Sequence, residues 1–205
     1  KLMYEGDYLN GEKNGNGKYY RYYNDILIFE EGFGKAKEYY KDGKLEYEGE
    51  YSNGERNGKG KEYFDKDKLL KFEGEYFNGK RSGKGKEYNI SGKLIFEGEY
   101  LNGKKWNGKR KEYSNNGKLS FEGEYFNGKK WNGKSYNILS NEETLLKDGK
   151  GHVIEYNDNG KLIFEGEYLN GEKWNGKIKE YSDKDILIFD GEYLNGKRNG
   201  KGKEY

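Results

Sequence analysis

Three groups of residues in this sequence have the types and spacing that chemistry requires. Residues 128–135 read Gly-Lys-Lys-Trp-Asn-Gly-Lys-Ser, which satisfies the spacing of a phosphate-binding loop. Pairs of glutamates such as Glu73 and Glu75 could supply the two carboxylates of a glycosidase. His152 is the only histidine, and an imidazole can act as a general acid or base. The residues around each group decide whether this chemistry is possible.

The surrounding pattern argues against catalysis in all three groups. A phosphate-binding loop needs a helix directly after it, and no helical pattern follows Ser135. The same loop spacing recurs in residues 103–109 and 171–177 without the hydroxyl residue. The glutamate pair recurs along most of the chain, and a lone histidine cannot build a catalytic triad or a His-rich metal site. We therefore expect no enzyme, no cofactor, no metal and no small-molecule substrate.

Composition excludes several further classes of protein. The 205 residues include 33 Gly but no Pro and no Cys, so disulfide frameworks and cysteine zinc sites are impossible. Lys and Arg number 39 against 37 Asp and Glu, a balance that argues against nucleic-acid binding. The longest apolar runs, residues 26–29 and 186–189, fall far short of the roughly 20 residues that a membrane helix needs. The 22 Tyr can still supply a thin aromatic core.

An internal repeat dominates the sequence. The string Phe-Glu-Gly-Glu-Tyr or a close variant occurs at residues 4–8, 47–51, 72–76, 96–100, 121–125, 164–168 and 189–193. The leading aromatic recurs at steps of 25, 18, 25, 24 and 25 residues, and a step of 43 to Phe164 follows. Because 43 is one full step and one short step, a hidden repeat is predicted to start at Leu146. The sequence thus predicts nine repeats, with the second and seventh truncated near residues 29–39 and 146–156.

Residues 137–150 have a second interpretation. Ser140-Asn141-Glu142-Glu143 has the pattern of a helix capping box, which predicts a helical insertion. We favour the truncated repeat, because it keeps the phase of the array. Glu31-Gly32 and Asp148-Gly149 are then expected to make the shortened turns. The missing tip of the seventh repeat would leave a notch walled by Trp131, Trp174 and His152, which is a candidate contact site.

Each repeat has the pattern of a β-hairpin. Phe72, Gly74 and Tyr76 alternate with charged residues, and this period of two places them on one face of a strand. Asn78-Gly79 supplies the positive φ angles of a tight turn. The glycine between two aromatics leaves space for a ring to lie across the bare backbone. The expected fold class is all-β, an elongated single-layer antiparallel sheet of stacked hairpins.

These residues resemble the MORN repeat family, whose pattern is roughly Tyr-x-Gly-x-Trp/Tyr-x-x-Gly-x-x-x-Gly-x-Gly. The matching residues are Phe72, Gly74, Tyr76, Gly79, Gly83 and Gly85, and likewise Tyr47, Gly49, Tyr51, Gly54, Gly58 and Gly60. The resemblance implies one repeat array over residues 1–205, curved and with an aromatic groove. It also implies protein interaction or dimerisation, and binding of acidic phospholipids has been proposed for such arrays. Because the chain starts at Lys1, we expect it to be a fragment of a longer protein.

The leading functional prediction is a non-enzymatic scaffold. A stiff sheet with an aromatic stripe could bind an amphipathic segment of a partner protein, or a second copy of itself, in the cytoplasm. The stripe that would line this groove consists of Phe72, Tyr76, Phe96, Tyr100, Phe121, Tyr125, Phe164 and Tyr168.

The alternative is peripheral binding to acidic phospholipids, at the cytoplasmic face of a membrane or at the cytoskeleton. Basic residues near a membrane contribute about 1 kcal/mol each, and tryptophan suits the interface. The candidates at the hairpin tips are Trp106, Trp131, Trp174, Lys104, Lys105, Lys129 and Lys130. Two plainer interpretations stay open: the lysines could only protect the sheet edge, and each tryptophan could fold back over its own hairpin.

Overall fold

The computed structural model describes residues 4–9, 12–20, 26–29, 33–40, 42–52, 55–65, 68–140 and 142–205. The described residues form strands and turns without any helix, which confirms the all-β prediction. The chain divides into two compact units, residues 1–105 and 106–205, and the boundary falls within strand β10. Each unit is described by itself below.

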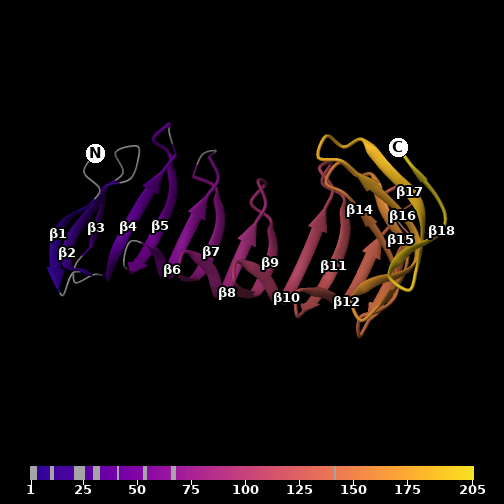
Figure 1. Ribbon diagram of the computed structural model, residues 1–205, viewed down its shortest axis with the longest axis horizontal. Coiled ribbons are helices and arrows are strands. Elements are labelled where there is room, and N and C mark those ends of the chain that lie inside the picture. Colours follow the sequence, from indigo (N-terminus) through magenta and orange to yellow (C-terminus); the bar gives the residue numbers. More distant parts are fainter. Residues whose placement is uncertain are drawn as a thin grey trace. The chain divides into compact units, whose positions relative to one another are not determined.

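The described residues of unit 1 contain nine complete strands. They are β1 (Tyr4–Leu9), β2 (Glu12–Tyr20), β3 (Ile26–Phe29), β4 (Phe33–Tyr39), β5 (Leu45–Ser52), β6 (Glu55–Tyr63), β7 (Leu70–Phe77), β8 (Lys80–Tyr88) and β9 (Leu94–Leu101). Strands β1 to β3 form a small antiparallel sheet of their own, whereas β4 to β9 pair in chain order (Figure 1). The stacked antiparallel hairpins confirm the predicted fold class. The turn predicted at Glu31-Gly32 lies outside the described residues.

Unit 2 contains the remaining strands, which also pair in chain order. They are β10 (Lys104–Tyr113), β11 (Leu119–Phe126), β12 (Lys129–Tyr136), β13 (Glu143–Lys147), β14 (Lys150–Tyr156), β15 (Leu162–Leu169), β16 (Glu172–Tyr181), β17 (Leu187–Leu194) and β18 (Lys197–Glu204). In the described part of the chain, β18 pairs with β17 on one side only (Figure 1).

The Asn-Gly turns form as the sequence predicts. Asn78 has a φ of 47° and Gly79 a φ of 74°, so both central residues adopt the positive angles that the turn requires. The Gly79 amide then donates a hydrogen bond of 2.9 Å to the Arg56 carbonyl of the preceding hairpin. The same bond recurs from Gly103 to Arg81. The turns at Gly79 and Gly103 are therefore each joined to the hairpin before them.

A row of glycines crosses the middle of unit 1, and rings cover it on one face. In the strand register Gly49 faces Gly60, Gly60 faces Gly74, and Gly74 faces Gly85. The Phe72 ring lies over this backbone: a Cβ at Gly74 would stand 2.7 Å from Phe72 Cζ. Real Cβ atoms do not approach that closely, so the glycines are required. This confirms that a ring lies across the bare backbone.

The segment 143–156 in unit 2 is a short hairpin, as the truncated repeat predicts. Asp148 and Gly149 form its turn with φ angles of 51° and 71°. Residues 137–140 and 142–150 contain no helix, so the helical interpretation is wrong. Val153 faces Gly166 in the register and is fully buried, so a side chain fills the position that glycine holds elsewhere. Leu146 and Val153 enlarge the core here.

Candidate functional site

The predicted groove residues do not line an open groove. All eight are buried, from 0% exposed for Phe72 and Phe164 to 9% for Tyr125. In unit 1 the rings pack edge to face, as between Phe72 and Tyr76 with centroids 5.5 Å apart. The aromatic stripe is therefore the core of the sheet. The eight buried rings are Phe72, Tyr76, Phe96, Tyr100, Phe121, Tyr125, Phe164 and Tyr168.

A layer of ion pairs covers these rings. The Arg81 guanidinium lies 4.2 Å from the centre of the Phe72 ring, and it pairs with Glu62 at 2.7 Å and Glu87 at 3.1 Å. The Tyr76 hydroxyl donates to the same Glu62 at 2.6 Å. This cation, carboxylate and phenol set covers the aromatic face.

The same set recurs in the third to sixth and the eighth repeats, and the ninth repeat shares its cation and carboxylate, Arg198 and Glu180. The further cations over rings are Arg56 over Tyr47, Lys105 over Phe96, Lys130 over Phe121, Lys173 over Phe164 and Arg198 over Phe189. Tyr125 donates to Glu112 and Tyr168 to Glu155, as Tyr76 does to Glu62. The arrangement is thus built into the repeat.

The buried carboxylates are held in the ionised form. Burial by itself would raise the pKa of Glu155, but the charges of Lys130 and Lys173 outweigh it and lower the pKa to about 2. Burial likewise opposes ionisation of Glu62, and Arg81 outweighs it, so its pKa is also lowered. Carboxylates with lowered pKa values cannot serve as general acids near neutral pH. Their role is structural.

The lysines proposed for lipid binding are mostly engaged within the fold. Lys130 is only 8% exposed, and it pairs with Glu112 at 3.0 Å and Glu155 at 2.6 Å. Lys105 pairs with Glu87 at 3.1 Å. Lys129 pairs with Glu172 at 2.8 Å, and Lys104 is exposed. These four residues do not form a free cationic edge.

Two of the tryptophans at the hairpin tips, Trp131 and Trp174, contact the turn glycine of the following hairpin. A Cβ at Gly149 would stand 2.7 Å from Trp131 Cζ3, so the indole packs against this turn glycine. Trp174 lies in the same way beside Gly196. All three tryptophans, including Trp106, are half-buried. Trp131 also packs against Phe126 of its own hairpin, with ring centroids 5.4 Å apart. The interpretation that a tryptophan folds over its own hairpin therefore holds for Trp131, which contacts the following turn as well.

The predicted notch in the seventh repeat is not present. The Gly149 amide donates to the Trp131 carbonyl at 2.8 Å, and the Gly171 amide donates to the Gly149 carbonyl at 2.9 Å. The short Asp148-Gly149 turn is therefore hydrogen-bonded to the hairpin before it and to the hairpin after it, and Trp131 fills the space beside it. His152 instead pairs with Glu167 at 3.1 Å on strands β14 and β15.

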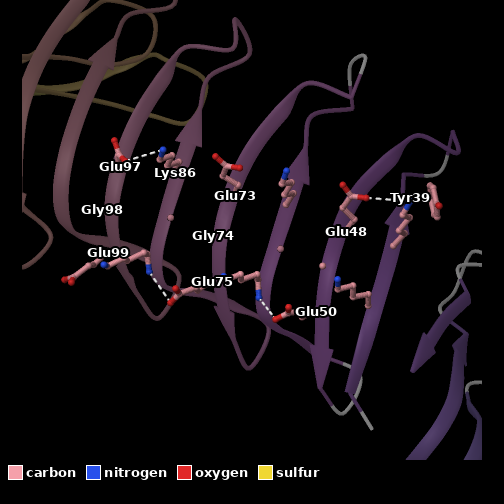
Figure 2. A pocket seen from close by; sticks show the side chains of 18 residues that line it. Tyr39, Glu48, Glu50, Glu73, Gly74, Glu75, Lys86, Glu97, Gly98 and Glu99 are labelled. Atoms are coloured by element: carbon pink, nitrogen blue, oxygen red, sulfur yellow. Dashed lines mark hydrogen bonds and ion pairs between the residues drawn. The ribbon is translucent and has the colours of Figure 1, made fainter. Parts of the chain in front are cut away.

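A groove lies on the opposite, charged face of unit 1. Its volume is about 1060 Å³, and a row of glycines forms its floor. Figure 2 shows Glu48, Glu73 and Glu97 on one side of the glycines and Glu50, Glu75 and Glu99 on the other. The lining residues are Lys35, Lys37, Tyr39, Glu48, Gly49, Glu50, Lys59, Gly60, Lys61, Glu73, Gly74, Glu75, Lys84, Gly85, Lys86, Glu97, Gly98 and Glu99.

Hydrogen bonds fix the acidic walls of this groove. On one side the Tyr63 hydroxyl donates to Glu48 at 2.7 Å, and burial together with that carboxylate raises the pKa of Tyr63 to about 12. On the other side the backbone N–H of Lys59 donates to Glu50 at 2.8 Å. Lys86 pairs with Glu97 at 3.4 Å across neighbouring strands. The walls are thus ordered before any ligand arrives.

The sequence contains a signal for this groove in its recurring glutamate pairs. The string Glu73-Gly74-Glu75 puts two carboxylates on one face with a residue that has no side chain between them. Repetition of this string across paired strands makes two walls and a floor.

The groove has the chemistry of a binding surface. It is lined by lysines, glutamates, glycines and one tyrosine, and it contains no serine, cysteine or histidine that could act as a nucleophile or base. In the described part of the chain, no cluster of His, Cys, Asp and Glu could hold a metal ion. A search of the same residues found no helix long and apolar enough to cross a membrane.

Comparison with known proteins supports the pattern seen in the repeats. The MORN repeat family model matches residues 4–22, 47–67, 72–93 and 189–205. The matched segments coincide with hairpins in both units. No curated protein matches the chain.

Proposed function

Since four segments of this chain are MORN repeats, we propose that it is a non-enzymatic scaffold whose charged-face groove in unit 1 holds an extended segment of a partner protein. MORN repeats are in general interaction or membrane-associated modules. The observation that carries the proposal is the preordered groove of about 1060 Å³ along the glycine row. The aromatic face, in contrast, is closed by its own ion pairs.

The width of the groove favours an extended chain over a helix. Its two walls come from residues that are two apart on each strand, such as Glu73 and Glu75, so their Cα atoms stand about 7 Å apart. A helix with side chains is about 10–12 Å wide. An extended backbone can approach the floor, because the residues between the two walls direct their side-chain positions to the opposite face of the sheet.

The charges favour a segment that carries both signs. Lysine pairs line β4, β6 and β8, and glutamate pairs line β5, β7 and β9, so six cations face six anions. A polyanion would meet a glutamate pair on every second strand. The balanced walls therefore disfavour nucleic acid and acidic lipid as occupants.

The strand spacing sets a period for this segment. Strands stand about 4.8 Å apart, so walls of like charge recur about every 9.6 Å. Three residues of a polyproline-like extended chain span about 9.3 Å. A matching partner therefore carries like charges at every third residue.

A peptide display experiment tests the proposal. Peptides selected from a random library on the whole chain are measured by calorimetry against the chain and two double variants. Glu73→Lys with Glu97→Lys reverses two wall charges, and Glu122→Lys with Glu165→Lys reverses the corresponding charges in unit 2. We expect binding to survive in the unit 2 variant and to be lost in the groove variant. Equal binding by both variants would contradict the proposal.

Self-association is the competing use of the same surface. Sedimentation of the unmodified chain over a range of concentrations distinguishes the two. A dimer that the groove variant abolishes would show that a second copy is the occupant.

A further inference from the structure

Asparagine followed by glycine is unusually frequent in this chain. The sequence contains 16 such pairs. In this dipeptide the backbone nitrogen of the glycine can attack the carbonyl carbon of the asparagine side chain, because no Cβ hinders its approach. The product of that attack is a cyclic imide. The structure decides which pairs can reach the geometry for it.

At the hairpin turns the attacking nitrogen is already engaged. The Gly79 amide donates to the Arg56 carbonyl at 2.9 Å, and the Gly196 amide donates to the Trp174 carbonyl at 2.9 Å. The Gly128 amide is held by the Trp106 carbonyl at 2.8 Å. A nitrogen held by a carbonyl of the preceding hairpin is not free to turn toward its own asparagine.

Within the second strands of three hairpins the asparagine side chain is engaged instead. The Asn107 side-chain oxygen accepts the backbone N–H of Asn127 at 2.9 Å. Asn132 accepts the N–H of Asp148 at 2.8 Å, and Asn175 accepts that of Asn195 at 2.9 Å. These side chains are held toward the next turn.

Asn199 has the reactive arrangement. The Gly200 backbone N–H donates a hydrogen bond of 2.7 Å to Asn199 Oδ1, so its nitrogen is held beside its own asparagine side chain and not by a carbonyl of another hairpin. Since the C=O bond is about 1.23 Å long, the nitrogen is at most about 3.9 Å from the carbon that it must attack. Gly200 has a φ of 75°, and every residue of β18 is exposed. Water can therefore reach the site.

A second copy of the same local sequence gives an internal control. Residues 56–63 and 198–205 both read Arg-Asn-Gly-Lys-Gly-Lys-Glu-Tyr. Asn57 is half-buried in β6, which pairs with β5 on one side and β7 on the other. The neighbouring Lys59 N–H is bound to the Glu50 carboxylate. Any difference in reactivity between Asn57 and Asn199 therefore comes from the fold.

We propose that Asn199 is a site of spontaneous deamidation. The Gly200 nitrogen forms a bond to Asn199 Cγ, the bond from Cγ to the side-chain nitrogen breaks, and ammonia leaves with the proton of the Gly200 amide. Water then adds to one of the two imide carbonyls and opens the ring to aspartate or isoaspartate. The net reaction consumes one water and releases one ammonia.

The modification changes the hairpin of β17 and β18. Aspartate adds a negative charge close to Glu192, whose carboxylate lies beside Gly200. Isoaspartate adds one methylene to the backbone of β18, so the residues after it lose their register with β17, where Lys203 faces Asp190. Both products weaken the pairing of β18 with β17.

Peptide mapping of the aged chain tests the proposal. The chain is incubated in mildly alkaline buffer made with heavy-oxygen water, which labels each opened ring, and then digested after glutamate. That digestion separates the two copies of the octapeptide, and fragment masses distinguish Asn199 from Asn195. We expect Asn199 to convert about tenfold faster than Asn57, and the two rates to converge in denaturant.

The variant Asn199→Gln provides the matched control. It should lose the label at residue 199 and leave the rate at Asn57 unchanged. Equal rates at Asn57 and Asn199 in the folded chain would overturn the proposal. If Asn199 still converts faster than Asn57 in denaturant, the proposal is overturned as well, because the fold could not cause that difference.

Discussion

The octapeptide Arg-Asn-Gly-Lys-Gly-Lys-Glu-Tyr stands in two surroundings, in β6 and in β18. In β6 the Arg56 side chain is 19% exposed and pairs with Glu38 at 2.9 Å, while Gly60 is covered by the buried ring of Tyr47. In β18 the Arg198 side chain is 43% exposed, and all residues of the strand are exposed. The residues are identical, so the hairpins on either side decide whether they become core or surface.

Replacement of the arginine should give the largest difference in stability loss between the two copies of the octapeptide. Arg56→Ala removes both guanidinium hydrogen bonds to the buried Glu38 and the contact with the Tyr47 ring. Breaking such a buried pair costs about 3–5 kcal/mol. Arg198→Ala should cost far less, because the ion pair with Glu180 is exposed to water. Urea unfolding of the two variants measures both values. Equal losses would contradict the view that neighbours define the core.

Replacement of a glycine should give a smaller difference in stability loss, again with the larger loss in β6. A Cβ at Gly60 would stand 2.6 Å from Tyr47 Cε2, and Tyr47 is fully buried. At Gly202 the corresponding approach, to Phe189 Cε2, is 3.0 Å. Overpacking of a core costs about 1–3 kcal/mol, so Gly60→Ala should lower the unfolding midpoint more than Gly202→Ala does. Thermal unfolding followed by circular dichroism compares them, and a larger loss at Gly202 would be the unexpected result.

Acid should weaken the contribution of the β6 copy of the octapeptide to stability. The pKa of Glu62 is lowered in the fold, so its stabilising contribution is complete above about pH 4.5 and is lost as the pH falls below that value. For Glu155, with a pKa of about 2, the loss extends over the range from about pH 4.5 to 2.

Glutamine variants separate the two copies. Glu62→Gln should lower stability at neutral pH and flatten the decline in acid. Glu204→Gln, whose carboxylate is mostly exposed, should follow the unmodified chain. Unfolding midpoints between pH 7 and pH 2 give both profiles. If the unfolding midpoint of Glu62→Gln falls with pH as steeply as that of the unmodified chain, other groups govern the loss of stability in acid.

The lysines at the hairpin tips give the smallest expected effect. Lys105 is held by Glu87, whereas Lys104 is exposed. With a net charge of +2 and exposed charges screened over about 8 Å at physiological salt, we expect little flotation with phosphatidylserine vesicles. Lys104→Ala with Lys129→Ala should change this little. Strong flotation that the double variant abolishes would instead favour the lipid alternative.

The sequence predicted the features that arise within one hairpin. The turn at Asn78-Gly79, the ring of Phe72 over glycine and the short turn at Asp148-Gly149 depend on residues close together in the chain, and all three are confirmed.

Features that join neighbouring hairpins were missed or misjudged. Arg81 finds its carboxylate in Glu62, 19 residues away, and the Trp131 ring lies over the turn glycine of the next repeat. The register that brings these residues together cannot be derived from the alternation of a single strand. This is why the rings were interpreted as an open groove, and why the groove on the other face was not predicted.

The hydrogen bond from each turn glycine to the hairpin before it also bears on how such a chain changes in evolution. The bond uses only backbone atoms, so it does not depend on the side chains of either neighbour. The seventh repeat is shorter than the others, yet Gly149 makes the same bond and passes it on to Gly171. A duplicated or deleted hairpin can therefore rejoin the line with whichever neighbour it meets. The number of repeats becomes a property that a single recombination event can alter without redesigning the fold.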